Sequence, residues 1–252
     1  MLPKDTLSRP DLFSAKRVVC IQPHYDDNDI YAGGTIALLH DLGAEIIYLT
    51  VTDDLVGVLD QSLTDEQMTR QLRAEQKEAG EIIGVKEQYW LGYPDAGQYD
   101  YYQLRKDLIG YIRLLQPDFV MTVDPWLPYE AHRDHILTGQ AASEAVLLVG
   151  FTRLKSKLEI DQCYDHHKLQ GIAYYNSPWP NLVVDISRTT RRKHKAFCAY
   201  KAQFTNDDLA DLEQETELNE KKAADGQNFS HGEQIKVIRP NQLHGNTATW
   251  QS

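Results

Sequence analysis

The sequence is poor in cysteine and has no long apolar run. Its three cysteines, Cys20, Cys163 and Cys198, are odd in number, far apart and form no CxxC pair. This argues against a disulfide framework and against a cysteine zinc site. No apolar stretch has the roughly 20 residues that a membrane-spanning helix needs, and the N-terminal residues lack the basic-then-apolar pattern of a secretory signal. We therefore expect a cytoplasmic protein with no membrane partner.

Positively charged residues are also scarce, which argues against some classes of ligand. The chain of 252 residues carries 26 Lys and Arg against 37 Asp and Glu, a formal net charge of −11. Binding to nucleic acid needs clustered Lys and Arg that pair with phosphates, so we expect no nucleic-acid partner. No GxGxxG motif follows the first apolar run, which disfavours a dinucleotide-binding domain.

Apolar runs and helical patterns alternate along the first two thirds of the chain. Runs at 18–21, 45–51, 89–91 and 119–123 predict strands, and the segments 30–42, 64–83, 104–115 and 136–148 have helical spacing. Such alternation predicts an α/β fold with a mostly parallel, doubly wound sheet flanked by helices, in a single domain.

After residue 150 the pattern weakens. Residues 172–175 and 182–185 predict strands, 187–203 a basic helix and 206–225 a charged helix, and the last 20 or so residues are expected to form a polar loop or tail. We expect residues 1–205 to form the α/β domain, with the charged helix and polar tail of 206–252 packed on it or extending from it.

Two polar clusters stand out because each follows a predicted strand. The first is Gln22-Pro23-His24-Tyr25-Asp26-Asp27, and the second is His132-Arg133-Asp134-His135. In open α/β sheets, ligands bind in the crevice beyond the carboxyl ends of the strands. The two clusters therefore predict one divided metal site.

The residue types in these clusters suit a catalytic zinc ion, which takes three protein ligands and a water. His24 and Asp27 offer two ligands from one turn, and His135 or His132 offers the third. Asp26 is a neighbouring carboxylate that can take a proton from a metal-bound water. The same nitrogen and oxygen donors also suit iron or another divalent ion. Asp27 could instead cap the following helix.

The first cluster, with Gly33-Gly34-Thr35, resembles the P-H-P-D-D-E…G-G-T signature of the LmbE/PIG-L family of N-deacetylases. Four further segments follow in the order found in that family: Arg73-Ala74-Glu75 with Ala79 and Gly84-Val85, Leu91-Gly92-Tyr93-Pro94-Asp95, His132-Arg133-Asp134-His135, and Val184-Asp185-Ile186-Ser187 with Lys195, Ala196, Tyr200 and Gln203. The resemblance covers roughly residues 15 to 204.

This resemblance implies a Rossmann-like fold and a zinc-dependent removal of the N-acetyl group from an N-acetylglucosamine-type sugar or glycoconjugate. By position, the metal ligands are His24, Asp27 and His135, Asp26 is the general base, and His132 stabilises the oxyanion or protonates the leaving amine. Asp134 orients a ligand histidine, and Arg73 and Asp95 lie near the sugar. The resemblance is also compatible with a homo-oligomer.

The first cluster departs from the family signature at two positions. Tyr25 replaces a proline and is expected to narrow the mouth of the site or to stack on a sugar. Asn28 replaces a glutamate. Tyr31, Trp126 and Tyr129 are further candidates for sugar-stacking walls. Two alternative functions remain: a metal-dependent hydrolase of another amide or ester, and a non-catalytic sugar-binding member of the same fold.

Overall fold

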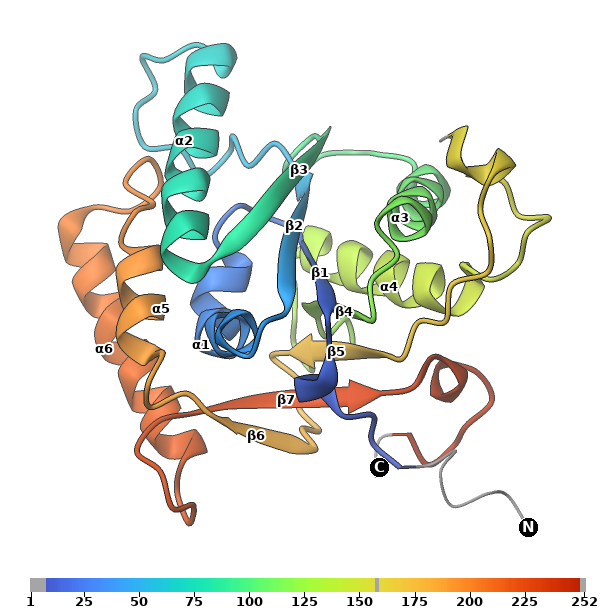
Figure 1. Cartoon of the computed structure of the whole chain (residues 1–252). Coiled ribbons are helices and arrows are strands. Elements are labelled where there is room, and N and C mark those ends of the chain that lie inside the picture. The colour runs from blue at the N-terminus through green and yellow to red at the C-terminus, as the bar shows by residue number, and fades with distance from the viewer. Residues whose placement is uncertain (1–7, 157–158, 250–252) are drawn as a thin grey trace.

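A seven-stranded sheet forms the centre of the molecule, with the strand order β3-β2-β1-β4-β5-β7-β6 (Figure 1). The computed structural model describes residues 8–156 and 159–249. The strands are β1 Arg17–Gln22, β2 Glu45–Thr52, β3 Val85–Tyr93, β4 Phe119–Val123, β5 Gly171–Tyr175, β6 Leu182–Asp185 and β7 Gly232–Ile238. The first five strands pair in parallel, and β7 is antiparallel to both β5 and β6. The predicted mostly parallel, Rossmann-like sheet is confirmed.

Helices cover both faces of this sheet. They are α1 Asp27–Asp41, α2 Asp65–Ile83, α3 Tyr101–Leu115, α4 Arg133–Leu148, α5 Thr190–Phe197 and α6 Asn206–Ala223. Helices α1, α2, α5 and α6 lie on one face, and α3 and α4 lie on the other (Figure 1). This is the doubly wound arrangement that alternating strands and helices predict.

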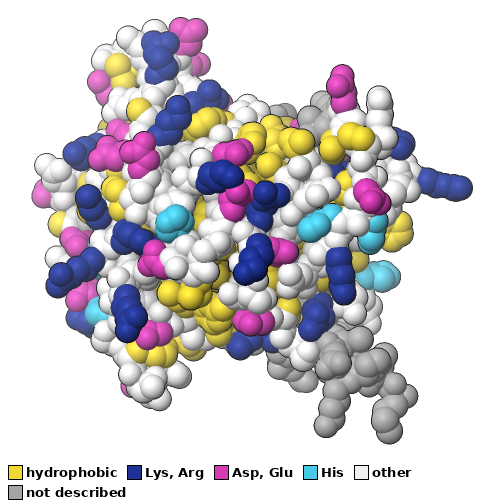
Figure 2. All heavy atoms as spheres, viewed as in Figure 1, with side chains coloured by type: hydrophobic (Ala, Val, Ile, Leu, Met, Phe, Trp, Pro, Cys, Tyr) yellow, Lys and Arg dark blue, Asp and Glu magenta, His cyan; other side chains and the backbone are white. Residues whose placement is uncertain are grey.

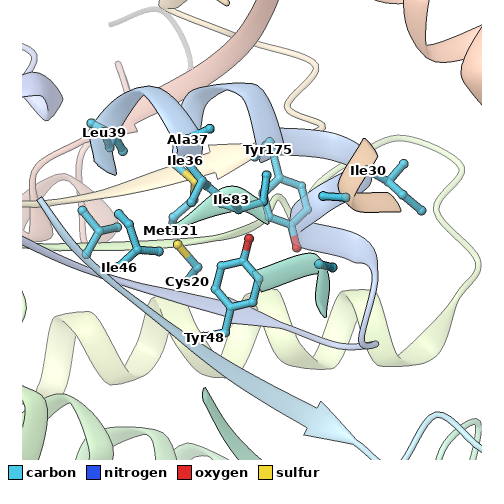
Figure 3. Close-up of a cluster of buried hydrophobic side chains, with 14 of the residues drawn as sticks. Cys20, Ile30, Ile36, Ala37, Leu39, Ile46, Tyr48, Ile83, Met121 and Tyr175 are labelled. Carbon is cyan, nitrogen blue, oxygen red and sulfur yellow. The ribbon is translucent and has the colours of Figure 1, made fainter. Parts of the chain in front are cut away.

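The side chains of β1 divide between two hydrophobic cores because successive residues of a strand point to opposite faces. Val18 and Cys20 pack into the core under α1, while Val19 and Ile21 pack into the core under α3 and α4. Figure 3 shows part of the first core, where apolar side chains of α1 lie close to Cys20 and Met121. A strand buried on both faces explains the uninterrupted apolar run of the sequence.

The ends of α2 follow the sequence signals. The Thr64 side chain accepts a hydrogen bond from the backbone N–H of Gln67, and the Gln67 side chain accepts one from the backbone N–H of Thr64, which is a complete capping box. The helix closes at Gly84, whose φ of 103° favours glycine. Both predicted limits of this helix are therefore confirmed.

Two expectations for the C-terminal third were wrong. The basic helix is shorter than predicted, since α5 spans only Thr190–Phe197, and the segment expected as a polar tail contains strand β7. That strand lies inside the sheet although it carries Glu233 and Lys236, both of which are buried. Glu233 can be buried because it pairs with Lys193 of α5, and this partner cannot be read from the pattern of side chains along the strand.

Charged side chains of both signs are interspersed over the face seen in Figure 2, where neither sign forms a large continuous area. Among the described residues, none of the helices combines the length and the apolar character that crossing a membrane requires.

Candidate metal centre

The site lies where the chain changes direction across the sheet. From β1 the chain proceeds outward to β2 and β3, and it then returns to place β4 on the other side of β1. Because β1 and β4 are adjacent and parallel, the segments after their carboxyl ends meet at one edge. This edge is the switch point at which doubly wound folds bind ligands. The two histidine clusters of the sequence occupy it.

Three imidazoles gather at this edge. The His24 ring lies 4.6 Å from the His132 ring and 5.3 Å from the His135 ring, centroid to centroid, and the His132 and His135 rings are 5.1 Å apart. His24 and His135 are buried, whereas the His132 side chain is 45% exposed. The structure thus brings the two predicted clusters together, with His132 on the open side.

Asp27 links two of these histidines. Its Oδ2 atom lies 3.2 Å from His24 Nδ1 and accepts the backbone N–H of His24 at 2.8 Å, and its Oδ1 atom lies 3.3 Å from His135 Nε2. Asp27 is the first residue of α1 rather than its N-cap, and its carboxylate turns back toward the histidines. The capping alternative for Asp27 therefore does not describe this geometry.

Two further carboxylates, those of Asp95 and Asp134, lie close to His24. His24 Nε2 lies 3.3 Å from Asp95 Oδ1 and 3.6 Å from Asp134 Oδ2. Asp134 also accepts hydrogen bonds from the Ala96 backbone N–H and the Tyr99 hydroxyl, at 2.8 and 2.9 Å. These bonds tie the loop after β3 to the start of α4. Asp134 and Asp95 thus both face the ring of His24.

Glu130 is a member of the site that sequence reasoning missed. Its Oε2 atom lies 3.5 Å from His135 Nδ1, and its Oε1 atom accepts the backbone N–H of His132 at 2.7 Å. The signal was its position two residues before His132. Outer carboxylates that hold the free nitrogen of a ligand histidine are a regular feature of metal sites.

The donor set fits a divalent cation. His24, His132 and His135 each offer a nitrogen, and these atoms lie within 4.8 Å of one another. A second set within the same limit joins His24 and His132 to Asp95 and Asp134. Nε2 of His24 and Nδ1 of His135 are buried and form no hydrogen bond of good geometry with any described residue. Imidazole nitrogen and carboxylate oxygen are ligands that zinc binds.

The adjacent carboxylates of Asp26 and Asp27 have pKa values shifted in opposite directions. Burial, together with the negative charges of Asp27 and Asp54, raises the pKa of Asp26 well above its usual value. Burial acts in the same direction on Asp27, but the nearby His135 and His24 outweigh it and lower the Asp27 pKa to about 2. Asp26 therefore has the stronger affinity for a proton, as a general base requires.

Asp54 is a second buried residue that the sequence did not single out. It accepts hydrogen bonds from the Tyr25 backbone N–H at 2.9 Å and from Gln203 Nε2 at 2.8 Å. Burial is the main reason that its pKa is raised to about 7. It belongs to the Thr52-Asp53-Asp54 run at the end of β2, and its bond to the Tyr25 backbone holds the turn that carries His24.

Tyr25 does not line the mouth of the site, which corrects the expectation for this position. Its side chain is 1% exposed and packs in the core under α1. Its hydroxyl accepts a hydrogen bond from Arg73 Nε at 3.5 Å, and the Arg73 guanidinium lies 4.9 Å from the centre of the Trp90 ring. Tyr25 therefore cannot stack on a sugar, whereas Trp126 and Tyr129 are exposed on the loop after β4.

Asn28 is the second departure from the family signature within the first cluster. It is fully buried, its backbone N–H donates to Gln22 Oε1 at 2.8 Å, and its Nδ2 atom donates to the Cys20 carbonyl at 3.4 Å. The Asn28 side chain therefore faces the backbone near the end of β1. A carboxylate there would face a carbonyl oxygen instead of donating to it.

The sequence matches a known protein family and several known proteins. Residues 19–146 match the family model PIG-L, described as GlcNAc-PI de-N-acetylase. The chain is 35% identical to a diacetylchitobiose deacetylase of Thermococcus kodakarensis over 76% of this chain and 72% of that protein. It is 23% identical to a probable N-acetyl-alpha-D-glucosaminyl L-malate deacetylase of Bacillus anthracis, over 75% of this chain and 82% of the relative.

Among solved structures, the fold is similar to that of the N,N′-diacetylchitobiose deacetylase from Pyrococcus horikoshii. The TM-score is 0.84 at 34% identity, covering 93% of this chain and 88% of the other.

Proposed function

Because the chain belongs to the PIG-L family of de-N-acetylases, we propose that it hydrolyses the N-acetyl group of an N-acetylglucosamine-type sugar or glycoconjugate. The observation that carries this proposal is the meeting of His24, His132 and His135 beside Asp26 and Asp27 at the switch point of the sheet. The relatives named above act on N-acetyl sugars according to their names, and N,N′-diacetylchitobiose is the first substrate to test.

We propose His24, Asp27 and His135 as the residues that hold the metal, with zinc as the expected ion. Asp27 contacts both histidines, which supports this set. His132 is the alternative third ligand, because it joins the same two histidines within 4.8 Å. When bound, a divalent ion would polarise the acetamide carbonyl and lower the pKa of a water molecule.

Asp26 is the proposed general base. It is buried at the N-terminus of α1, directly before the proposed ligand Asp27, and its carboxylate does not cap the helix. It takes a proton from the water that adds to the acetamide carbon. When the carbon–nitrogen bond breaks, a proton is delivered to nitrogen, and the products are acetate and the free amino sugar. Proton transfer by a positioned side chain contributes about 10²- to 10⁴-fold to such reactions.

His132 is proposed to face the reacting amide. Its ring makes an edge contact with His24, and its side chain is partly open to solvent. In that position it can donate an N–H to the developing oxyanion or a proton to the leaving amine. Donors aimed at an oxyanion usually supply the largest catalytic term.

Asp134 and Glu130 are proposed positioning residues for His24 and His135, respectively. Arg73 and Asp95 keep the proposed role near the sugar, and the contact of Asp95 with His24 adds a positioning role. Location in the cytoplasm and assembly as a homo-oligomer remain predictions. Cell fractionation tests the first, and light scattering of the purified protein tests the second.

The experiment for the proposed function is acetate release from N-acetylglucosamine, N,N′-diacetylchitobiose and simple amides and esters, combined with elemental analysis of the purified protein. Release from the sugars, and not from simple amides or esters, is expected. A protein that prefers simple amides or esters would be a hydrolase of another class. A protein that binds metal and sugar but never releases acetate would be a binding member of the fold.

A further inference from the structure

A cavity of about 420 Å³ lies outside the histidine cluster, between α1, α6 and the start of β7. Figure 1 shows α6 beside the beginning of β7, on the same side of the sheet as α1. The loop after β5 closes the remaining side. Five of the lining side chains that can bond a ligand are neutral amides and hydroxyls: Asn176, Ser177, Thr216, Asn219 and Gln234. We call this space the α1–α6 cavity.

The charges beneath the cavity are paired with one another. Lys193 Nζ lies 2.9 Å from Glu220 Oε1 and 2.8 Å from Glu233 Oε1, and all three side chains are buried. Glu233 also accepts the backbone N–H groups of Gly34 and Thr35, at 3.0 and 2.7 Å. These groups are therefore engaged within the protein and do not offer a free charge to a ligand.

The two remaining charged residues of the lining, Glu215 and Lys222, have opposite signs. A phosphate or carboxylate would meet a carboxylate together with a single lysine, which is a poor anion site. Neutral hydrogen-bonding groups around a concave space suit a ligand that carries hydroxyl or amide groups and no net charge.

Tyr31 gives the cavity an aromatic wall. Its ring is stacked on the Tyr175 ring, with centroids 6.0 Å apart and an angle of 16° between the planes. Tyr31 remains 39% exposed, so its orientation is fixed on one side while part of the residue is open. A rigid aromatic surface with polar groups around it is amphipathic, as a pyranose ring is.

Tyr31 also connects the cavity with the metal centre. Asp27 begins α1, and Tyr31 stands four residues later, about 6 Å further along the helix axis. Burial is the main reason that the pKa of the Tyr31 hydroxyl is raised, and the carboxylates of Asp27, Asp26 and Glu130 at the site and of Glu215 in the cavity wall add to it. The Tyr31 hydroxyl therefore lies within electrostatic range of carboxylates in the metal centre and in the cavity wall.

We propose that the α1–α6 cavity binds a second, uncharged sugar unit that is joined to the N-acetylglucosamine undergoing deacetylation. This assignment rests on the proposed function, because the metal centre must hold the acetylated sugar at the same time. The cavity then determines which glycoconjugates are preferred, and the histidine cluster determines the reaction.

The test compares the double variant Asn219→Ala/Gln234→Ala with the control Gln214→Ala. Asn219 and Gln234 are exposed and line the cavity, and Gln214 is an exposed residue of the same helix α6 that does not line it. Both N-acetylglucosamine and N,N′-diacetylchitobiose are used, and calorimetric affinity is measured beside acetate release.

For the disaccharide we expect the KM and the dissociation constant to rise about 30-fold in the double variant, since two lost neutral hydrogen bonds at about 1 kcal/mol each amount to about 2 kcal/mol. For the monosaccharide we expect less than about a 2-fold change in both variants, and Gln214→Ala should behave as the unmodified protein with either substrate. A Tyr31→Leu variant should show the same selective loss for the disaccharide.

The outcomes separate this proposal from the proposed function. Equal effects on both sugars, or no effect on either while acetate is released, would overturn the cavity assignment and leave the deacetylase. Cavity-dependent binding of the disaccharide without acetate release would support the cavity and overturn the enzyme. An N-acetylglucosaminyl malate that binds better than the disaccharide, with an advantage lost in Lys222→Ala, would assign the cavity to an acidic group instead.

Discussion

Asp26 and Asp27 are adjacent in the chain, yet their surroundings differ. Asp27 lies between two imidazoles, and its pKa is lowered, whereas Asp26 is buried near the carboxylates of Asp27 and Asp54, and its pKa is raised. One carboxylate is therefore suited to remain ionised beside a cation, and the other to accept a proton. The difference arises from which partners the turn after β1 brings to each residue.

Asp26→Asn should retain the metal and lose activity. The amide is nearly isosteric but cannot take a proton from water, so we expect kcat to fall by about 10²- to 10⁴-fold. Acetate release gives kcat, and elemental analysis gives the metal content. Asp41→Asn, at the exposed C-terminal end of the same helix, is the control. Loss of metal in Asp26→Asn would make Asp26 a ligand instead.

The third metal ligand is decided by comparing Asp27→Asn with His132→Gln. If Asp27 is the ligand, its variant should lose metal affinity by more than the about 10- to 100-fold that changes to outer partners of a ligand cost. His132→Gln should then keep the metal and lose activity. Metal titration followed by calorimetry measures both. The reverse result would assign the ion to the three imidazoles of His24, His132 and His135.

The sequence contained enough information to bring His24, Asp27 and His135 together, because the segments that carry them each follow a predicted parallel strand. It did not reveal Glu130 or Asp54, whose carboxylates matter only through contacts made in three dimensions. The direction of the Tyr25 side chain could not be predicted from the sequence either. A tyrosine next to a site can face solvent or the core, and the packing under α1 decided for the core.

Helix α1 is packed closely against the segment that precedes α5. A Cβ atom added at Gly34 would lie 2.8 to 2.9 Å from three atoms of Ile186. The Thr189 hydroxyl also donates to the Gly34 carbonyl at 2.8 Å. The absence of a side chain at Gly34 thus allows the segment before α5 to approach the helix that carries the metal ligands.

Gly34→Ala should destabilise the protein by about 1–3 kcal/mol, the usual cost of overpacking, even though alanine is the better helix former by about 1 kcal/mol. Urea unfolding followed by circular dichroism measures the change. Gly33→Ala should cost less, since its added carbon meets one atom of Lys193 at 3.0 Å and the next at 3.4 Å. A Gly34 variant as stable as the unmodified protein would contradict the packing argument.

Strand β7 shows why some strands cannot be predicted from the pattern of polar and apolar residues. Its sequence, Gly232-Glu233-Gln234-Ile235-Lys236-Val237-Ile238, mixes polar and apolar residues without a clean alternation. Glu233 is buried because Lys193, 40 positions earlier, lies 2.8 Å from its carboxylate. The pattern along one strand cannot report a partner on another element, whereas β1 and β4 need no such partner and were predicted.

At the scale of the whole molecule, the C-terminal segment is part of the central sheet. In the described part of the chain, β6 has only β7 as its sheet neighbour, and β7 also pairs with β5. A chain truncated after residue 205 would lose β7 and both carboxylates that pair with Lys193. We expect it to fail to fold, as seen by loss of cooperative thermal unfolding.

The control for this truncation is a chain that ends at Asn246, beyond β7, which should unfold cooperatively. Removing one partner of a buried ion pair costs about 3–5 kcal/mol, and the loss of an internal strand adds to it. A stable, monodisperse 1–205 fragment would instead show that the first part of the chain is an independent domain.

Metal removal should lower the stability of the entire fold, because a ligand that binds only the folded state stabilises it. At 100 times its dissociation constant, an ion contributes about 2.7 kcal/mol. For a chain of this size, 1 kcal/mol corresponds to about 2–4 °C in Tm. We therefore expect the Tm to fall by roughly 5–10 °C after chelation and to recover with Zn²⁺, measured by differential scanning calorimetry.

His135→Ala is the matched control for this metal effect, since it removes a ligand shared by the proposed set of His24, Asp27 and His135 and by the set of three histidines. Its Tm should not respond to chelation or to added Zn²⁺. An unmodified protein whose Tm is also indifferent to both would contradict a metal bound between the two loops.

The order of the strands has a consequence for synthesis on the ribosome. Strand β5 ends at Tyr175, but its neighbour β7 ends at Ile238, which is 238 − 175 = 63 residues later. At about 5–20 residues per second, the nascent chain carries β5 with an unpaired edge for roughly 3 to 13 seconds. Open strand edges recruit other chains, so a chaperone is expected to influence the yield most during this interval.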